Sequence, residues 1–77
     1  MNYNNEKYLF EQMQKGIPPY QIINQMLEKG TIQNPKQAWA TLEKWDDKGI
    51  INYGVSLDFA WLEQKYKSID FSLVRKD

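Results

Sequence analysis

The residue types that most often perform catalysis are missing from this 77-residue sequence. It contains no histidine and no cysteine, which removes the commonest general base, the thiol nucleophile and the usual zinc ligands. Asp46 and Asp47 are adjacent, and on a helix they would point about 100° apart, so they cannot act together on one substrate. The isolated glycines form no phosphate-binding loop. We therefore expect no catalytic residue, no metal site, no cofactor and no enzyme activity.

Lysine side chains are the remaining candidates, because they can contact phosphate groups. Ten lysine and arginine residues balance ten aspartate and glutamate residues, and the two signs are mixed along the chain without a basic block. A positive surface must therefore be created by folding. On a helix over residues 35–48, four polar side chains would share one face of about 120°: Lys36, Gln37, Lys44 and Lys48. This face is either a solvated surface or an edge that contacts phosphates.

The helix over residues 35–48 has the clearest signals in the chain. Asn34 is a favourable N-cap, Pro35 suits the first helical position, and Gly49 ends the helix. Trp39 lies about 60° from the apolar stripe at Leu42, so it is either a flank residue that packs on a further helix or an exposed anchor for a partner protein. The apolar stripe itself is expected to be buried: Ala38, Leu42 and Trp45.

Two helices are predicted before it. The first covers about residues 4–15 and is followed by Gly16, a common C-terminal stop. The second begins in the "GIPPY" stretch, where Pro19 is tolerated in the first turn, and ends at Gly30. Apolar residues at helical spacing are expected to face the core: Tyr3, Leu9, Phe10, Met13 and Ile17 from the first helix, and Ile22, Ile23, Met26 and Leu27 from the second.

The rest of the chain allows more than one structure. The "IINY" stretch predicts a short strand, because it combines β-branched and aromatic residues. Residues 55–61 alternate like a half-buried strand, whereas the apolar residues of 57–68 keep helical spacing, and we favour a fourth helix. The tail, 70–77, either adds a strand beside "IINY" or frays. We expect a single domain over residues 1–77 with its core at about 4–69.

The third predicted helix and the strand after it resemble winged helix-turn-helix regulators. The resemblance is carried by residues of "LEKWDDKGII": Leu42, Glu43, Lys44, Trp45, Lys48, Gly49, Ile50 and Ile51. It extends over residues 17–53 and implies a supporting helix at 20–29 and a recognition helix at 35–48. The first exposed turn of the recognition helix would face the DNA major groove: Lys36, Gln37, Trp39 and Ala40. The chain departs from the pattern in the wing, since "NYGVSLDFAW" has no lysine or arginine.

With this resemblance, we expect a mainly α, winged-helix-like domain of three or four helices with a minimal β element. The implied function is a small DNA-binding or transcription-regulating module, acting as a homodimer, and the Asn-, Lys-, Ile- and Tyr-rich composition indicates a bacterium or its phage. The alternative is a protein–protein interaction adaptor on the same fold, with Trp39 as its surface anchor. No apolar stretch approaches the roughly 20 residues of a membrane span, so we expect a cytoplasmic protein. The candidate DNA-binding residues are Lys36, Gln37, Trp39, Ala40, Lys44 and Lys48.

Overall fold

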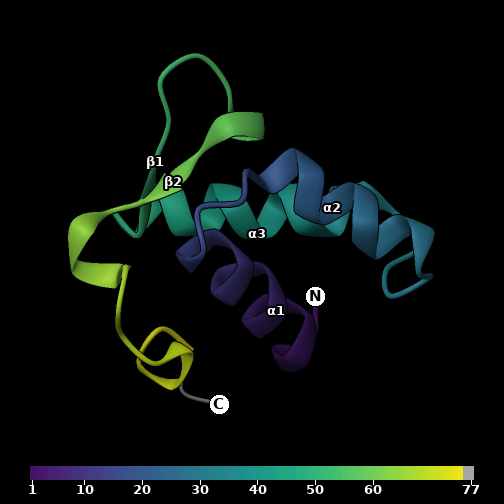
Figure 1. Ribbon diagram of the computed structural model, residues 1–77, viewed down its shortest axis with the longest axis horizontal. Helices are drawn as coiled ribbons and strands as arrows, with labels where there is room; N and C mark the ends of the chain where they lie inside the picture. The colour runs from purple at the N-terminus through teal and green to yellow at the C-terminus, as the bar shows by residue number, and fades with distance from the viewer. Residues whose placement is uncertain (76–77) are drawn as a thin grey trace.

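Three α-helices and one β-hairpin make up the fold in the computed structural model, which describes residues 1–75 (Figure 1). The helices are α1 (Tyr3–Gln14), α2 (Pro19–Glu28) and α3 (Pro35–Asp47). The strands β1 (Ile51–Asn52) and β2 (Trp61–Leu62) pair antiparallel, with Ile51 opposite Leu62 and Asn52 opposite Trp61. The predicted mainly α class with a minimal sheet is confirmed, and the three predicted helices end within two residues of the observed ones.

The two ends of α3 form as its flanking residues predict. The Asn34 side chain accepts a hydrogen bond of 2.8 Å from the backbone N–H of Lys36, which satisfies a donor that has no partner inside the helix. At the other end Gly49 adopts a φ of +75°, a conformation that costs a residue with a Cβ but not glycine. The N–H of Ile50 then donates to the carbonyl of Trp45 at 2.9 Å, closing a Schellman turn. This turn leads the chain from α3 into the hairpin.

The helices are short. A membrane-spanning helix needs about 20 apolar residues, and α3 has 13 residues with charged side chains among them. Within residues 1–75, no helix has both the length and the apolar character needed to cross a bilayer.

The hydrophobic core lies between the three helices, the hairpin and the C-terminal segment. Ala38, Leu42 and Trp45 are all buried, as predicted. The ring of Phe10 contacts the rings of Trp45 and Phe71, with centroid separations of 5.8 Å and 5.4 Å. The remaining buried hydrophobic residues of this cluster are Leu9, Met13, Ile22, Ile23, Met26, Ile32, Ile50, Ile51, Ala60 and Leu62. Tyr3, Ile17 and Leu27, predicted to face the core, are partly buried at its edge.

The expected fourth helix over 57–68 is wrong. This segment contains two 3₁₀ turns, Leu57–Phe59 and Gln64–Tyr66, with β2 between them. Strand pairing overrides the helical spacing, because Leu62 is buried opposite Ile51 and the N–H of the next residue donates to the carbonyl of Ile50 at 2.9 Å. Helical spacing of apolar residues predicts a helix only weakly, because tertiary contacts such as strand pairing can bury the same residues.

The C-terminal segment neither frays nor adds a strand within the described residues. It forms a 3₁₀ turn, Phe71–Leu73, whose first residue is buried against the rings of Tyr3, Phe10 and Trp45. The Asp70 side chain caps this turn by accepting a hydrogen bond of 3.0 Å from the backbone N–H of Ser72. The core therefore extends past residue 69, where the sequence analysis placed its limit. Residues 76–77 of the predicted tail lie outside the described part of the chain.

Candidate nucleic-acid interface

The outer face of α3 carries five of the six candidate DNA-binding residues. Because α3 buries the stripe at 38, 42 and 45 against α1 and α2, the opposite side of the helix faces solvent (Figure 1). The candidate residues that the structure exposes on this side are Lys36, Gln37, Ala40, Lys44 and Lys48, and two carboxylates, Glu43 and Asp47, are exposed on it as well.

Trp39, the sixth candidate, does not belong to this exposed group. Its side chain is half-buried and packs against the hydrophobic core cluster. It is therefore placed as a flank residue, as one of the two interpretations predicted, although the helix expected to cover it does not exist.

Five residues of α3 and its C-cap, Lys48, line a hollow that the two ends of the described chain complete. The hollow has a volume of about 640 Å³. Its lining comes from α3, from the N-terminal part of α1 and from the segment after the last 3₁₀ turn: Gln37, Ala40, Thr41, Lys44, Trp45 and Lys48, then Met1 and Glu6, then Val74 and Arg75. Residues about 30 to 70 positions apart in sequence thus meet at one edge of α3.

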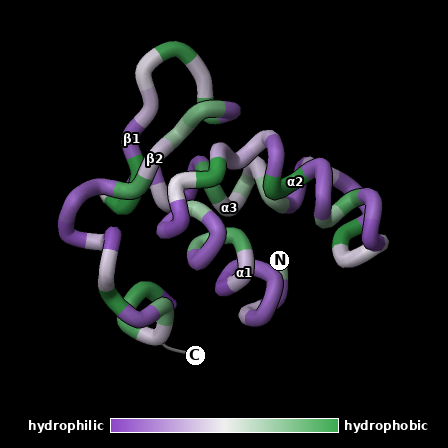
Figure 2. Tube along the Cα trace, viewed as in Figure 1, coloured by the Kyte–Doolittle hydropathy of each residue, from purple (hydrophilic) through white to green (hydrophobic). Residues whose placement is uncertain are grey.

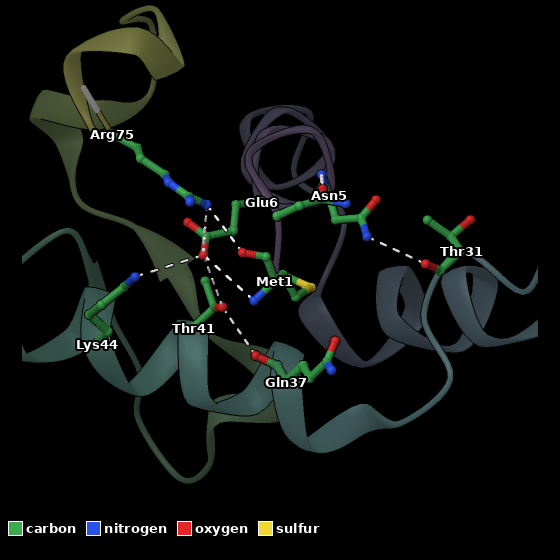
Figure 3. Close-up of polar contacts among 9 residues, drawn as sticks. Met1, Asn5, Glu6, Thr31, Gln37, Thr41, Lys44 and Arg75 are labelled. Atoms are coloured by element: carbon green, nitrogen blue, oxygen red, sulfur yellow. Dashed lines mark hydrogen bonds and ion pairs between the residues drawn. The ribbon is translucent and has the colours of Figure 1, made fainter. Parts of the chain in front are cut away.

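A buried carboxylate lies at the base of the hollow. The Glu6 side chain is 3 % exposed, and its Oε2 atom is 3.3 Å from Nη1 of Arg75 and 3.7 Å from Nζ of Lys44. The Thr41 hydroxyl donates to the same oxygen at 3.4 Å, and the α-amino group of Met1 is 4.0 Å away (Figure 3). A carboxylate buried without partners would cost several kcal/mol, roughly as much as breaking a buried ion pair. These contacts compensate Glu6 and draw Arg75 and Lys44 together.

Among the described side chains that line the hollow, positive charges outnumber negative ones. Three cationic side chains line it, Lys44, Lys48 and Arg75, against the single carboxylate of Glu6 among the lining residues of the described chain. The carboxylate is nearly inaccessible, whereas the Lys44 side chain is 50 % exposed. Solvent therefore meets the cations first, and folding creates the positive surface that the mixed charges of the sequence do not display.

A second exposed surface, which we call the hairpin surface, is apolar. It consists of Tyr20 on α2 and four residues of the hairpin, and the rings of Tyr20 and Phe59 meet edge to face with centroids 5.3 Å apart. A hydrophobic stretch lies at the tip of the loop that joins β1 and β2 (Figure 2). Val55, a residue of this loop, is 99 % exposed. Residues 53–61 carry one charged side chain, Asp58, and no cation. The exposed apolar side chains are Tyr20, Tyr53, Val55, Phe59 and Trp61.

Sequence reasoning missed Glu6 and Arg75. A signal for Glu6 was present, since residues 3, 6, 10 and 13 recur at helical spacing and three of them are apolar. A carboxylate on the inward stripe needs a cationic partner when it is buried. No comparable signal marks Arg75, because the position of the tail depends on the burial of Phe71, which the sequence left open.

Comparison of the chain with protein-family models, with curated proteins and with solved structures finds no match.

Proposed function

We propose that this protein binds duplex DNA through the outer face of α3, as a winged-helix module. The observation that carries the proposal is the meeting of Lys44, Lys48 and Arg75 at one edge of an exposed helix. Phosphate contacts by lysine and arginine supply most non-specific DNA affinity. The same edge exposes Gln37, whose amide can hydrogen-bond to a base or to a phosphate oxygen.

The arrangement of the elements supports this assignment. Helix α3 follows a shorter helix, α2, and leads through the Gly49 turn into the antiparallel hairpin (Figure 1). A recognition helix followed by a hairpin is the order that the winged-helix resemblance implies. An exposed helix of 13 residues extends about 20 Å and can lie in a major groove about 12 Å wide.

The charge also indicates how tightly the domain binds. Lys36, Lys44, Lys48 and Arg75 allow at most about four phosphate contacts, fewer than the six to ten of strongly salt-dependent DNA-binding proteins. The hairpin adds none, because it has no cation. We therefore propose low affinity for a single domain and a homodimer as the working form in transcription regulation, since two copies double the contacts.

Fluorescence anisotropy with a labelled random-sequence duplex, titrated at several salt concentrations, tests this function. Lys44→Ala and Lys48→Ala should each weaken binding, and each should make the slope of log K against log salt shallower by about 0.9. Lys15→Ala is the matched control, because Lys15 is an exposed lysine at the end of α1 and does not line the hollow. Absence of binding at low salt, with folded protein at tens of micromolar, would set the proposal aside.

A second candidate function is protein binding through the hairpin surface. Aromatic side chains often anchor protein interfaces, and the rings of Tyr20 and Phe59 are exposed and in contact with each other. This surface replaces Trp39 as the anchor of an adaptor. Protein binding by this surface is tested by producing the protein in cells with a photo-crosslinking amino acid at position 55. A specific crosslinked protein should be lost on Phe59→Ser but kept on Leu73→Ser, since both side chains are 61 % exposed. Equal loss in both variants, or no crosslink, would refute it.

A further inference from the structure

We infer that the hollow between α3, the N-terminal part of α1 and the C-terminal segment is a phosphate-binding site. The inference rests on the proposed DNA-binding function and deepens it, because the ligand it names is a phosphate of the DNA backbone. The cationic side chains that line the hollow outnumber its carboxylate by three to one. A bound phosphate diester would place negative charge beside the exposed ammonium groups of Lys44 and Lys48.

Lys48 is the principal donor for such an anion. Its side chain is exposed, lines the hollow and makes no hydrogen bond or ion pair within residues 1–75. An ammonium group has three donors, so all three can turn toward a ligand. Lys48 is the C-cap of α3, one turn after Lys44 on the same side of the helix.

Lys44 supplies the second contact. Its Nζ atom is 3.7 Å from Oε2 of Glu6, a distance that gives an ion pair but exceeds that of a hydrogen bond. The ammonium therefore keeps its hydrogen-bonding capacity for an incoming oxygen. Gln37, about two turns earlier on the same helix, lines the hollow with a side-chain amide that also donates.

Glu6 positions the site without blocking it. Its carboxylate pairs with Arg75 at 3.3 Å and is 3 % exposed, so it holds a tail cation against α3 and leaves little negative surface to repel a ligand (Figure 3). Without this carboxylate, mutual repulsion between Lys44 and Arg75 would separate them.

The size of the hollow favours a phosphate group of a DNA backbone over a free phosphate ion. Its volume of about 640 Å³ falls within the range of small-molecule sites, about 300–1,000 Å³, and exceeds what a lone phosphate fills. The sugars on either side of a backbone phosphate would occupy the rest. A free phosphate ester carries the same charged group as the DNA backbone. The experiment below distinguishes these two ligands.

The test is a two-dimensional ¹H–¹⁵N NMR titration of the full chain with three probes: inorganic phosphate, dimethyl phosphate and a short random-sequence duplex. Sodium chloride at matched ionic strength is the blank. Phosphate should shift the signals of Gln37, Lys44 and Lys48 more than chloride does. Lys48→Gln should weaken phosphate binding about fivefold. Lys15→Gln should leave it unchanged, because Lys15 is an exposed lysine at the end of α1 and does not line the hollow.

The outcomes separate this inference from the proposed function. Shifts with chloride alone, or equal binding by Lys48→Gln and the wild type, would overturn the phosphate site even if the duplex still bound elsewhere on α3. Phosphate binding at the hollow without any duplex binding would keep the site, assign it to free phosphate esters and refute DNA as the ligand. We expect dimethyl phosphate and the duplex to shift the same signals, and both to bind more weakly in Lys48→Gln.

Discussion

The burial of Phe71 decides whether the C-terminal segment is part of the fold. Its side chain is 1 % exposed and touches the rings of Tyr3, Phe10 and Trp45 at centroid distances of 5.2, 5.4 and 6.3 Å. Truncation of a core phenylalanine to alanine costs about 3–5 kcal/mol. We expect Phe71→Ala to fall in that range, because three aromatic neighbours lose their contact and cannot close the cavity together.

This loss would be large relative to the stability of the whole domain. A chain of this length has a free energy of unfolding of roughly 4–12 kcal/mol, and 1 kcal/mol corresponds to about 4–8 °C in Tm for a domain of this size. Phe71→Ala should therefore lower Tm by at least about 12 °C. Urea unfolding followed by tryptophan fluorescence measures the free energy directly, since Trp45 is buried beside Phe71.

Leu73→Ala is the control for this measurement. Leu73 belongs to the same 3₁₀ turn but is 61 % exposed, so its truncation should change the free energy of unfolding by less than about 0.5 kcal/mol. A loss below about 1 kcal/mol for Phe71→Ala would mean that the segment does not pack on the core. Arg75 would then have no fixed position, and the hollow would lose one of its walls.

Variants at three further positions test other parts of the fold. Leu42→Ala should cost about 2–5 kcal/mol in urea unfolding, and a loss under half a kcal/mol would mean that α3 faces the core with another side. Asn34→Ala should cost about 1 kcal/mol by removing the α3 cap, whereas Asn34→Asp should restore nearly all of it; equal losses would refute the capping role. The Ser72 backbone N–H holds the pKa of Asp70 below its usual value, so Asp70 stabilises the fold at neutral pH and loses that effect as the pH falls below about 4. Urea unfolding of Asp70→Asn between neutral and acidic pH should show a smaller acid-induced loss than the wild type, and identical pH profiles would contradict the assignment.

The helices could be predicted from sequence because their signals are local. Asn34, Pro35 and Gly49 act on residues within one turn of themselves, and the spacing of Ala38, Leu42 and Trp45 fixes the buried side of α3. The hairpin could not be predicted as reliably, since its strands have only two residues each. Leu62 belongs to a helical pattern and to a strand pair alike, and only the buried position opposite Ile51 decides between them.

The part of the candidate site that lies on α3 could be predicted, because it also depends on local helix geometry. The exposed residues of α3 follow from helix geometry, and Lys44 and Lys48 were among them. Glu6 and Arg75 are brought to α3 by the packing of α1 and of Phe71, contacts that span most of the chain. Counting charges along the sequence therefore gave no basic patch, although folding assembles one.

Binding of DNA by the outer face of α3 can be observed by mapping a duplex onto the protein. ¹H–¹⁵N NMR spectra recorded at low salt with increasing random-sequence duplex report on every backbone amide. We predict that the largest shifts fall on exposed residues of α3, from Lys36 to Lys48, and that they diminish as salt is added. Shifts confined to the hairpin surface at 53–61, or a spectrum unchanged by excess duplex, would contradict DNA binding by this face.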